Sequence, residues 1–380
     1  MKDIKIVIGA NFGDEGKGLM TDYFSQNPDT LVICFNGGAQ KGHTVVTPDG
    51  IRHVFHHFGS GTCSRAATYL MENFILNPII FRMEYEALQN IGVTPVVYVH
   101  RDCRVTTPFD MMANQMIEET RGKEKHGSCG LGIFETIKRY RAGIPDTMTA
   151  IRDYYRQRFR MEKRTLTKEW QMRFSDPGIW KHFLEDQQFM REHITVVENE
   201  AFFDAFSYFV FEAEQGLLLD QNNRAYFPHL TPSNTGIKNA RKVIERISWK
   251  EPVNIETCYV SRTYLTRHGA GKFPMECAKD QINAQMSDRT NMPNPYQGSL
   301  RYGMLDLREL QERCQSDVGT FGDQKSIAIT HCNEYRCDRK LLENVFQGWK
   351  IYLSDGETRK NIRLYQSGSC LLYTSPSPRD

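Results

Sequence analysis

The sequence lacks the long apolar run, the charge imbalance and the paired cysteine motifs that mark several classes of protein. No apolar stretch approaches the roughly 20 residues of a membrane-spanning helix. We also expect no signal peptide, because the first residues already form an apolar, strand-like run. The 48 basic and 46 acidic residues leave a net charge of +2, which gives no reason to expect nucleic acid or a membrane as a partner. The 10 cysteines form no zinc-type CxxC pairs and are expected to be reduced thiols of a cytoplasmic protein.

The last stretch of the sequence does not resemble a folded protein. Residues 370–380 read, codon by codon, as a translated sequencing-library adapter, so they are excluded from the reasoning on the fold. We expect residues 1–369 to form a single domain, and we expect the native chain to continue past Ser369.

Short apolar runs bounded by glycine-rich turns alternate with amphipathic segments along most of the chain. This alternation predicts an α/β fold with a mainly parallel central sheet flanked by helices. The chain contains no glycine from Met148 until Gly178. We expect residues 148–200, approximately, to form a helical subdomain inserted into the fold. The expected strands are 4–8, 30–35, 69–76, 96–99, 207–211, 254–260 and 326–330, with hairpins at 45–54 and 351–364.

A glycine-rich loop follows the first expected strand and leads into an amphipathic helix. The order of strand, loop and helix is typical of a phosphate-binding site, and Lys17 adds positive charge there. The usual Walker pattern is absent, since Asn11 and Gly18 stand where it needs Gly and Ser or Thr. Asp14 and Glu15 are unexpected in a plain phosphate cradle because carboxylates repel phosphate. An acid held in this loop must therefore face a metal ion or take a proton from the substrate.

This loop is the first of several short motifs along the chain. They are Gly13-Asp14-Glu15-Gly16-Lys17-Gly18, Gly42-His43-Thr44, Gly127-Ser128-Cys129-Gly130-Leu131-Gly132, Glu214-Gln215-Gly216 with Asp220, Thr231-Pro232-Ser233-Asn234, and Arg267-His268-Gly269-Ala270-Gly271 with Phe273-Pro274. In content and order, these motifs resemble the adenylosuccinate synthetase family. The resemblance implies a P-loop-like, GTPase-related architecture, a homodimer and a Mg²⁺-dependent ligase. Such a ligase joins IMP to L-aspartate with hydrolysis of a nucleoside triphosphate, through a 6-phosphoryl purine intermediate.

The resemblance also implies roles for individual residues. Asp14 is expected to be the general base that removes the purine N1 proton, His43 the acid on the phosphate side, and Gln215 the partner of the purine O6. Asp14 and the carbonyl of Gly42 are expected to bind Mg²⁺. The expected triphosphate-binding residues are Gly13, Glu15, Gly16, Lys17, Gly18, Gly42, Thr44, Thr330, His331 and Asn333. The expected purine monophosphate-binding residues are Asp14, Gln40, Lys41, Ser128, Cys129, Gln215, Thr231, Arg139 and Arg141. In the family, a partner subunit contributes one arginine to the monophosphate, and spacing does not decide whether that residue is Arg139 or Arg141.

Departures from the family pattern leave alternatives open. Only Arg301 matches the arginine-rich segment that binds aspartate. Asn333 replaces the acid that reads guanine, which favours ATP or dATP over GTP because an Asn side chain can pair with adenine. Some viral members of the family act on dGMP and have a small residue in place of Asp14, so the retained acid favours IMP. The alternatives are synthesis of 2-aminoadenylosuccinate from dGMP, and a nucleotide-binding protein without turnover.

Overall fold

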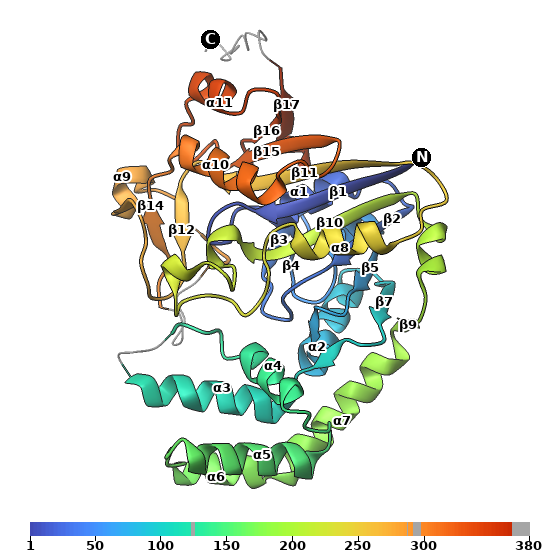
Figure 1. Cartoon of the computed structure of the whole chain (residues 1–380), viewed down its shortest axis with the longest axis vertical. Helices are drawn as coiled ribbons and strands as arrows, with labels where there is room; N and C mark the ends of the chain where they lie inside the picture. Colours follow the sequence, from blue (N-terminus) through green and yellow to red (C-terminus); the bar gives the residue numbers. More distant parts are fainter. Residues whose placement is uncertain (123–125, 287, 292–297, 367–380) are drawn as a thin grey trace, which may run out of the picture.

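The structure is a computed structural model that describes residues 1–122, 126–286, 288–291 and 298–366 (Figure 1). The interpretation of residues 370–380 lies outside the described residues. A ten-stranded sheet forms the centre, in the order β17-β16-β15-β11-β1-β10-β2-β5-β7-β9. Its strands are β1 (Lys2–Gly9), β2 (Thr30–Cys34), β5 (Ala67–Leu70), β7 (Val97–His100), β9 (Thr195–Val197), β10 (Tyr208–Gly216), β11 (Val253–Arg262), β15 (Gln324–Thr330), β16 (Lys350–Ser354) and β17 (Ile362–Tyr365). All neighbouring pairs are parallel except β16 and β17, so the predicted α/β fold with a mainly parallel sheet is confirmed.

Some helices pack against this sheet and others lie away from it (Figure 1). They are α1 (Lys17–Phe24), α2 (Pro78–Asn90), α3 (Pro108–Arg121), α4 (Ile133–Arg141), α5 (Met148–Met161), α6 (Lys168–Ser175), α7 (Pro177–Glu192), α8 (Lys238–Arg246), α9 (Lys279–Asn283), α10 (Leu307–Val318) and α11 (Arg339–Val345). Helices α3 to α7 gather below the sheet in the view of Figure 1, and α5 to α7 occupy the stretch for which the sequence predicts a helical subdomain. No helix in the described part of the chain is both long and apolar enough to cross a membrane.

Three small sheets complete the fold. The hairpin of β3 (His43–Val46) and β4 (Arg52–Phe55) lies where the sequence predicts it. Strand β14 (Arg301–Gly303) pairs with both β12 (Leu265–Arg267) and β13 (Glu276–Cys277). The predicted single strand 69–76 is wrong. The chain turns after β5, where the Phe74 amide donates to the Met71 carbonyl, and β6 (Ile75–Leu76) pairs with β8 (Arg104–Val105) in a separate sheet.

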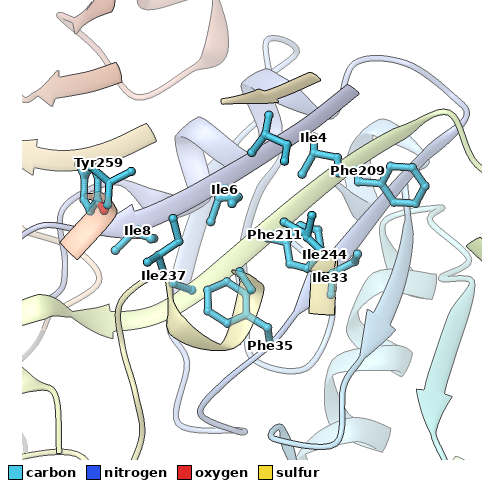
Figure 2. Close-up of a cluster of buried hydrophobic side chains, with 14 of the residues drawn as sticks. Ile4, Ile6, Ile8, Ile33, Phe35, Phe209, Phe211, Ile237, Ile244 and Tyr259 are labelled. Atoms are coloured by element: carbon cyan, nitrogen blue, oxygen red, sulfur yellow. The ribbon is translucent and has the colours of Figure 1, made fainter. Parts of the chain in front are cut away.

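Strand β1 lies at the middle of the main sheet, and its second half is buried on both faces, with Val7 on the face opposite to Ile6 and Ile8. Ile4, Ile6 and Ile8 are fully buried on one face, against aromatic and aliphatic side chains from β2, β10 and the region of α8 (Figure 2). Burial of each such side chain stabilises the fold by about 1.5–3 kcal/mol. Since parallel strands end at the same edge of a sheet, the loops after β1, β2, β10, β11 and β15 meet at one edge.

Candidate active site

The loop between β1 and α1 separates two adjacent acids. Asp14 has a left-handed backbone with φ of 57°, and its side chain remains 27% exposed. Glu15 turns inward, is 2% exposed, and accepts a hydrogen bond from the Asn11 amide. Burial raises the pKa of Glu15 to about 7, although Lys17, with Nζ 3.8 Å from the carboxylate, opposes this shift. Of the two acids, Asp14 is the one that is placed to meet a substrate or a metal ion.

A pocket brings together residues that are far apart in the sequence. Asp14 and His43 line it together with most of the predicted triphosphate-binding residues, namely Glu15, Gly16, Lys17, Gly18, Thr44, Thr330, His331 and Asn333. Gly13 and Gly42 do not line it but directly precede Asp14 and His43 in the sequence, and Gly42 is exposed. A buried lysine and two glycine loops around one pocket suit a polyanion. Among the described residues no cluster of three or more His, Cys, Asp or Glu could bind a metal ion by itself.

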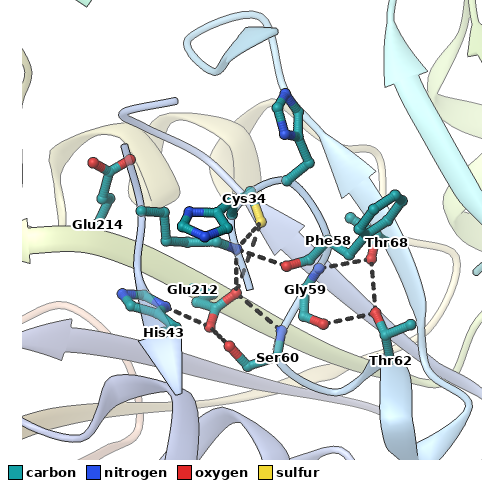
Figure 3. Close-up of polar contacts among 12 residues, drawn as sticks. Cys34, His43, Phe58, Gly59, Ser60, Thr62, Thr68, Glu212 and Glu214 are labelled. Atoms are coloured by element: carbon teal, nitrogen blue, oxygen red, sulfur yellow. Dashed lines mark hydrogen bonds and ion pairs between the residues drawn. The ribbon is translucent and has the colours of Figure 1, made fainter. Parts of the chain in front are cut away.

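His43 is held by a buried carboxylate that sequence analysis did not identify. The Nδ1 atom of His43 lies 2.8 Å from Oε1 of Glu212, which also accepts a hydrogen bond from the Ser60 hydroxyl (Figure 3). Desolvation lowers the pKa of His43 to about 4 despite the opposing effect of Glu212. The neutral imidazole therefore donates its Nδ1 proton to Glu212. Its Nε2 atom, on the other side of the ring, carries the lone pair.

Lys41 belongs to the same buried network. Its ammonium group lies 3.0 Å from Oε2 of Glu212 and donates to the Phe58 carbonyl at 2.8 Å. Glu212 and neighbouring groups hold the pKa of Lys41 above its usual range, although desolvation opposes this shift, so the side chain is charged. The sequence expects Lys41 at the purine monophosphate. The structure instead places its charge inside the protein, where it neutralises Glu212.

A second pocket contains two of the predicted monophosphate-binding residues, Thr231 and Arg141. Ser233, Asn234 and the backbone of Gly37 also line it. Hydroxyl, amide and guanidinium groups in one cavity suit a phosphate monoester.

Arg139, the alternative to Arg141, is fully buried and bound within its own chain. It donates to Asp110 at 2.9 Å and to the Val105 carbonyl at 2.8 Å, and it also pairs with Asp146. Of the two arginines, only Arg141 lines the second pocket.

Gln215 lies at the bulge that ends β10. The register of β10 against β1 shifts between Val7 and Gly9, and Gln215 has a left-handed backbone with φ of 63°. A β-bulge commonly re-aims a side chain next to a site. The Gln215 side chain lies beside Gly13 of the first loop.

The two predicted residues of the third glycine loop, Ser128 and Cys129, line neither of these pockets. Ser128 accepts a hydrogen bond from the Asn114 amide at 2.9 Å. Burial raises the pKa of the Cys129 thiol to about 11.

The segment expected to recognise aspartate is only partly described, since residues 292–297 are outside the described part of the chain. Arg301 pairs with Glu276 at 2.6 Å and donates to the Gly271 carbonyl at 2.9 Å. Asp288 and Arg289, which precede residues 292–297 in the sequence, line the first pocket.

Arg262, which the sequence does not single out, connects this segment to the first loop. Its guanidinium group donates to the Asp14 carbonyl and, at 3.1 Å, to the Asp288 carboxylate. Glu212 and Arg262 are both charged residues within apolar strands, and a charge in such a run is the one signal that indicates them in the sequence.

The parallel sheet, the glycine loop with its buried lysine and the polar pocket at the carboxyl edge define a nucleotide-phosphate-binding α/β protein. The family model for adenylosuccinate synthetase matches residues 6–333. The chain belongs to the adenylosuccinate synthetase family, whose members are carbon–nitrogen ligases. It is 28% identical to the adenylosuccinate synthetase of Flavobacterium johnsoniae, over 91% of this chain and 89% of that protein. It is 25% identical to that of Thermoplasma acidophilum, over 96% and 90%.

Solved structures share the fold. The fully ligated adenylosuccinate synthetase of Plasmodium falciparum has a TM-score of 0.72 at 17% identity, with 95% of this chain and 99% of that chain covered. The succinoaminodeoxyadenylate synthetase (PurZ) of cyanophage S-2L, bound to dGMP and to dATP as an energy donor, has a TM-score of 0.67 at 16% identity, with 96% and 95% covered.

Proposed function

We propose that this protein joins IMP and L-aspartate to form adenylosuccinate, with hydrolysis of a nucleoside triphosphate. The observation that carries this proposal is the pocket in which an accessible carboxylate, Asp14, lies with Lys17 and His43. A base, a fixed cation and an imidazole around one cavity are the groups that deprotonation followed by phosphoryl transfer requires.

The first step uses the base. Asp14 takes the proton from N1 of the 6-oxopurine, so that negative charge develops on O6. O6 then attacks the γ-phosphorus, and the bond from that phosphorus to the bridging oxygen of the diphosphate breaks. Lys17 and the amides of the glycine loop neutralise the charge of the phosphates. The products of this step are a 6-phosphoryl purine and a nucleoside diphosphate.

His43 has a protonation state that depends on its neighbours. The negative charge of a bound triphosphate, added to that of Glu212, favours the imidazolium form, which donates its Nε2 proton to a phosphate oxygen. In the second step the amino group of aspartate attacks C6. The bond from C6 to O6 breaks, inorganic phosphate leaves, and the nitrogen releases a proton.

Mg²⁺ fits the donor set of the site. Mg²⁺ keeps several waters and commonly takes one or two protein oxygens together with substrate phosphates. Asp14 and the backbone carbonyl of Gly42, which is an exposed residue, would hold it. The ion would neutralise phosphate charge during transfer.

The nucleotide specificity follows from two residues. Viral members of the family that act on dGMP have a small residue in place of Asp14, so the carboxylate retained here supports IMP over dGMP. Asn333 lines the first pocket, and its amide can pair with adenine, which supports ATP over GTP. PurZ of cyanophage S-2L, which has been solved with dGMP and dATP, makes dGMP the second candidate substrate. By membership of the family we also propose a homodimer, which sedimentation would test.

The test is a matrix of assays with purified protein, L-aspartate and Mg²⁺. IMP or dGMP is combined with ATP or GTP, and both phosphate release and purine absorbance are recorded. We expect phosphate release and a new absorbance with IMP, and faster turnover with ATP. Asp14→Ala serves as the matched control and should show neither signal while it retains the circular dichroism of the wild type. Turnover with dGMP but not with IMP would show that dGMP is the substrate. A strong preference for GTP over ATP would contradict the role of Asn333.

A further inference from the structure

A second buried acid, Glu214, lies on β10 next to Gln215 and has no role in the two proposed chemical steps. It follows Glu212 by two residues on β10, so the two side chains are on the same face of that strand (Figure 3). Glu214 is 2% exposed. Glu212 has Lys41 as an ion-pair partner, whereas no basic side chain within the described residues forms an ion pair with Glu214. A buried carboxyl group without an ion-pair partner is costly. Hydrogen bonds from the Gly38 amide and from the side chains of Gln215 and Gln40 retain it here.

The turn after β2 holds Glu214 in a fixed orientation. Its Oε2 atom accepts a hydrogen bond from the Gly38 amide at 2.7 Å. Asn36 binds the Glu214 backbone on both sides, at 2.8 Å to the amide and 3.2 Å to the carbonyl. A Cβ atom on Gly37 would lie 1.8 Å from Oε2, so the glycine at that position leaves room for the carboxyl group. The turn is therefore built around this side chain.

The other carboxyl oxygen of Glu214 faces the glutamine that is proposed to contact the purine. Oε1 lies 3.4 Å from Nε2 of Gln215. A carboxylate only accepts hydrogen bonds, and the Nε2 group of an amide only donates them. An ionised Glu214 therefore attracts the Nε2 end of Gln215, and the carbonyl end of the amide is left to face the purine.

We propose that Glu214 is a positioning residue whose carboxyl group decides which end of the Gln215 amide faces the purine. This inference rests on the proposed function. When Glu214 is protonated, its O–H donates to the carbonyl of Gln215, and Nε2 turns to the purine. Nε2 can then donate to O6, the atom on which negative charge develops. When Glu214 is ionised, a carbonyl faces O6 and repels it.

The groups around Glu214 allow this exchange near neutral pH. Burial raises the pKa of Glu214 to about 7. Glu15, in the first loop, also has a pKa raised to about 7, but it is retained in every variant used below. The titratable groups that face Glu214 keep one form between pH 5 and 9. Lys41 stays charged because its pKa lies above its usual range, and burial raises the pKa of the thiols of Cys129 and Cys34 to about 11 and about 12. Glu212, on the same strand, stays ionised because Lys41 and His43 hold its pKa below its usual range.

The decisive variant is Glu214→Gln. The carbonyl of the introduced amide accepts from the Gly38 amide, as the carboxylate of Glu214 did. The Nε2 group of the introduced amide then faces Gln215 and donates to the side-chain carbonyl of Gln215 at every pH. We expect the Kd of IMP for the wild type, measured by calorimetry without triphosphate or aspartate, to rise about fivefold between pH 5.5 and 8.5, which is the loss of about one hydrogen bond. In E214Q this fivefold rise should be lost, whereas any pH dependence that comes from Glu15 or from the phosphate group of IMP is common to both proteins. The KM for the triphosphate should be the same in both proteins.

A second variant separates positioning from packing. In a Gln215→Ala background, Glu214→Gln should change the Kd of IMP by less than twofold at any pH, because the residue through which Glu214 acts is gone. Equal pH dependence of IMP binding in wild type and E214Q, or no binding of IMP, would overturn the inference. The proposed function fails separately, when IMP binds with the expected pH dependence but no phosphate is released.

Discussion

The Nε2 atom of His268 lies 3.4 Å from Oδ2 of Asp14, and it also lies 2.9 Å from Oδ1 of Asn291. Asn291 donates to Asp288 at 2.7 Å, and Asp288 accepts from Arg262, which donates to the Asp14 carbonyl. The five residues form a closed ring of contacts that begins and ends at the proposed base. Both the carboxylate and the backbone of Asp14 are thereby fixed, in a left-handed conformation that costs about 1 kcal/mol or more without such support.

The ring predicts that His268 matters for turnover more than for binding. His268→Ala should lower kcat about tenfold, because the carboxylate of Asp14 loses the N–H group that orients it. His268→Gln, which retains a donor, should recover most of the loss. Steady-state kinetics with IMP would measure both. An alanine variant with unchanged kcat would show that the 3.4 Å contact has no role in orienting the base.

The buried pair of Lys41 and Glu212 should govern stability. Glu212→Gln leaves the charge of Lys41 uncompensated inside the protein, so we expect the free energy of unfolding to fall by about 3–5 kcal/mol. The double variant Lys41→Met with Glu212→Leu should be much closer to the wild type in urea denaturation, because no charge is left buried. If Lys41→Met instead raised the KM for IMP without loss of stability, Lys41 would contact the monophosphate after all.

Arg139 and Arg141 provide a matched pair of variants. Arg141→Ala should raise the KM for IMP about tenfold or more and leave the melting temperature unchanged, since its side chain lines the second pocket. Arg139→Ala should lower the melting temperature, because Asp110 keeps a buried charge without its partner. Kinetics and thermal unfolding on both proteins separate the two effects, and the opposite assignment of the two results would reverse the roles.

Glu214 should make stability depend on pH. Its folded pKa of about 7 lies above the usual 4.5, so the folded state holds a proton that the unfolded state releases. The wild type should therefore lose stability as the pH rises from about 4.5 to about 7, by up to about 3 kcal/mol relative to Glu214→Gln. Denaturation of both proteins across this pH range provides the measurement. The contribution of Glu15, whose pKa is also raised, cancels in the difference because both proteins retain that residue. Parallel stability curves would show that Glu214 has no raised pKa.

The sequence contains enough information to predict the sheet, because strands buried on both faces read as apolar runs such as Ile4–Ile8. It also predicts the acid, the lysine and the histidine of the first pocket, since they lie in glycine loops after strands. The pairing of Lys41 with Glu212 could not be predicted, because the partners are 171 residues apart and neither has a local signal for the other. The break between β5 and β6 was missed because an apolar turn has the same composition as a strand.

The position of β1 also affects how the chain folds. It is the first strand in the sequence, yet its neighbours pair Asp3 with Tyr208 and Lys2 with Val253. Each pairing closes a loop of about 200 residues or more, and the entropy of that closure is lost before any contact repays it. At roughly 5–20 residues per second on a ribosome, β1 waits for ten seconds or more with its isoleucines unpaired. The strand that organises the nucleotide site is thus the strand of the main sheet that waits longest for its partners during synthesis, with its edges open to aggregation.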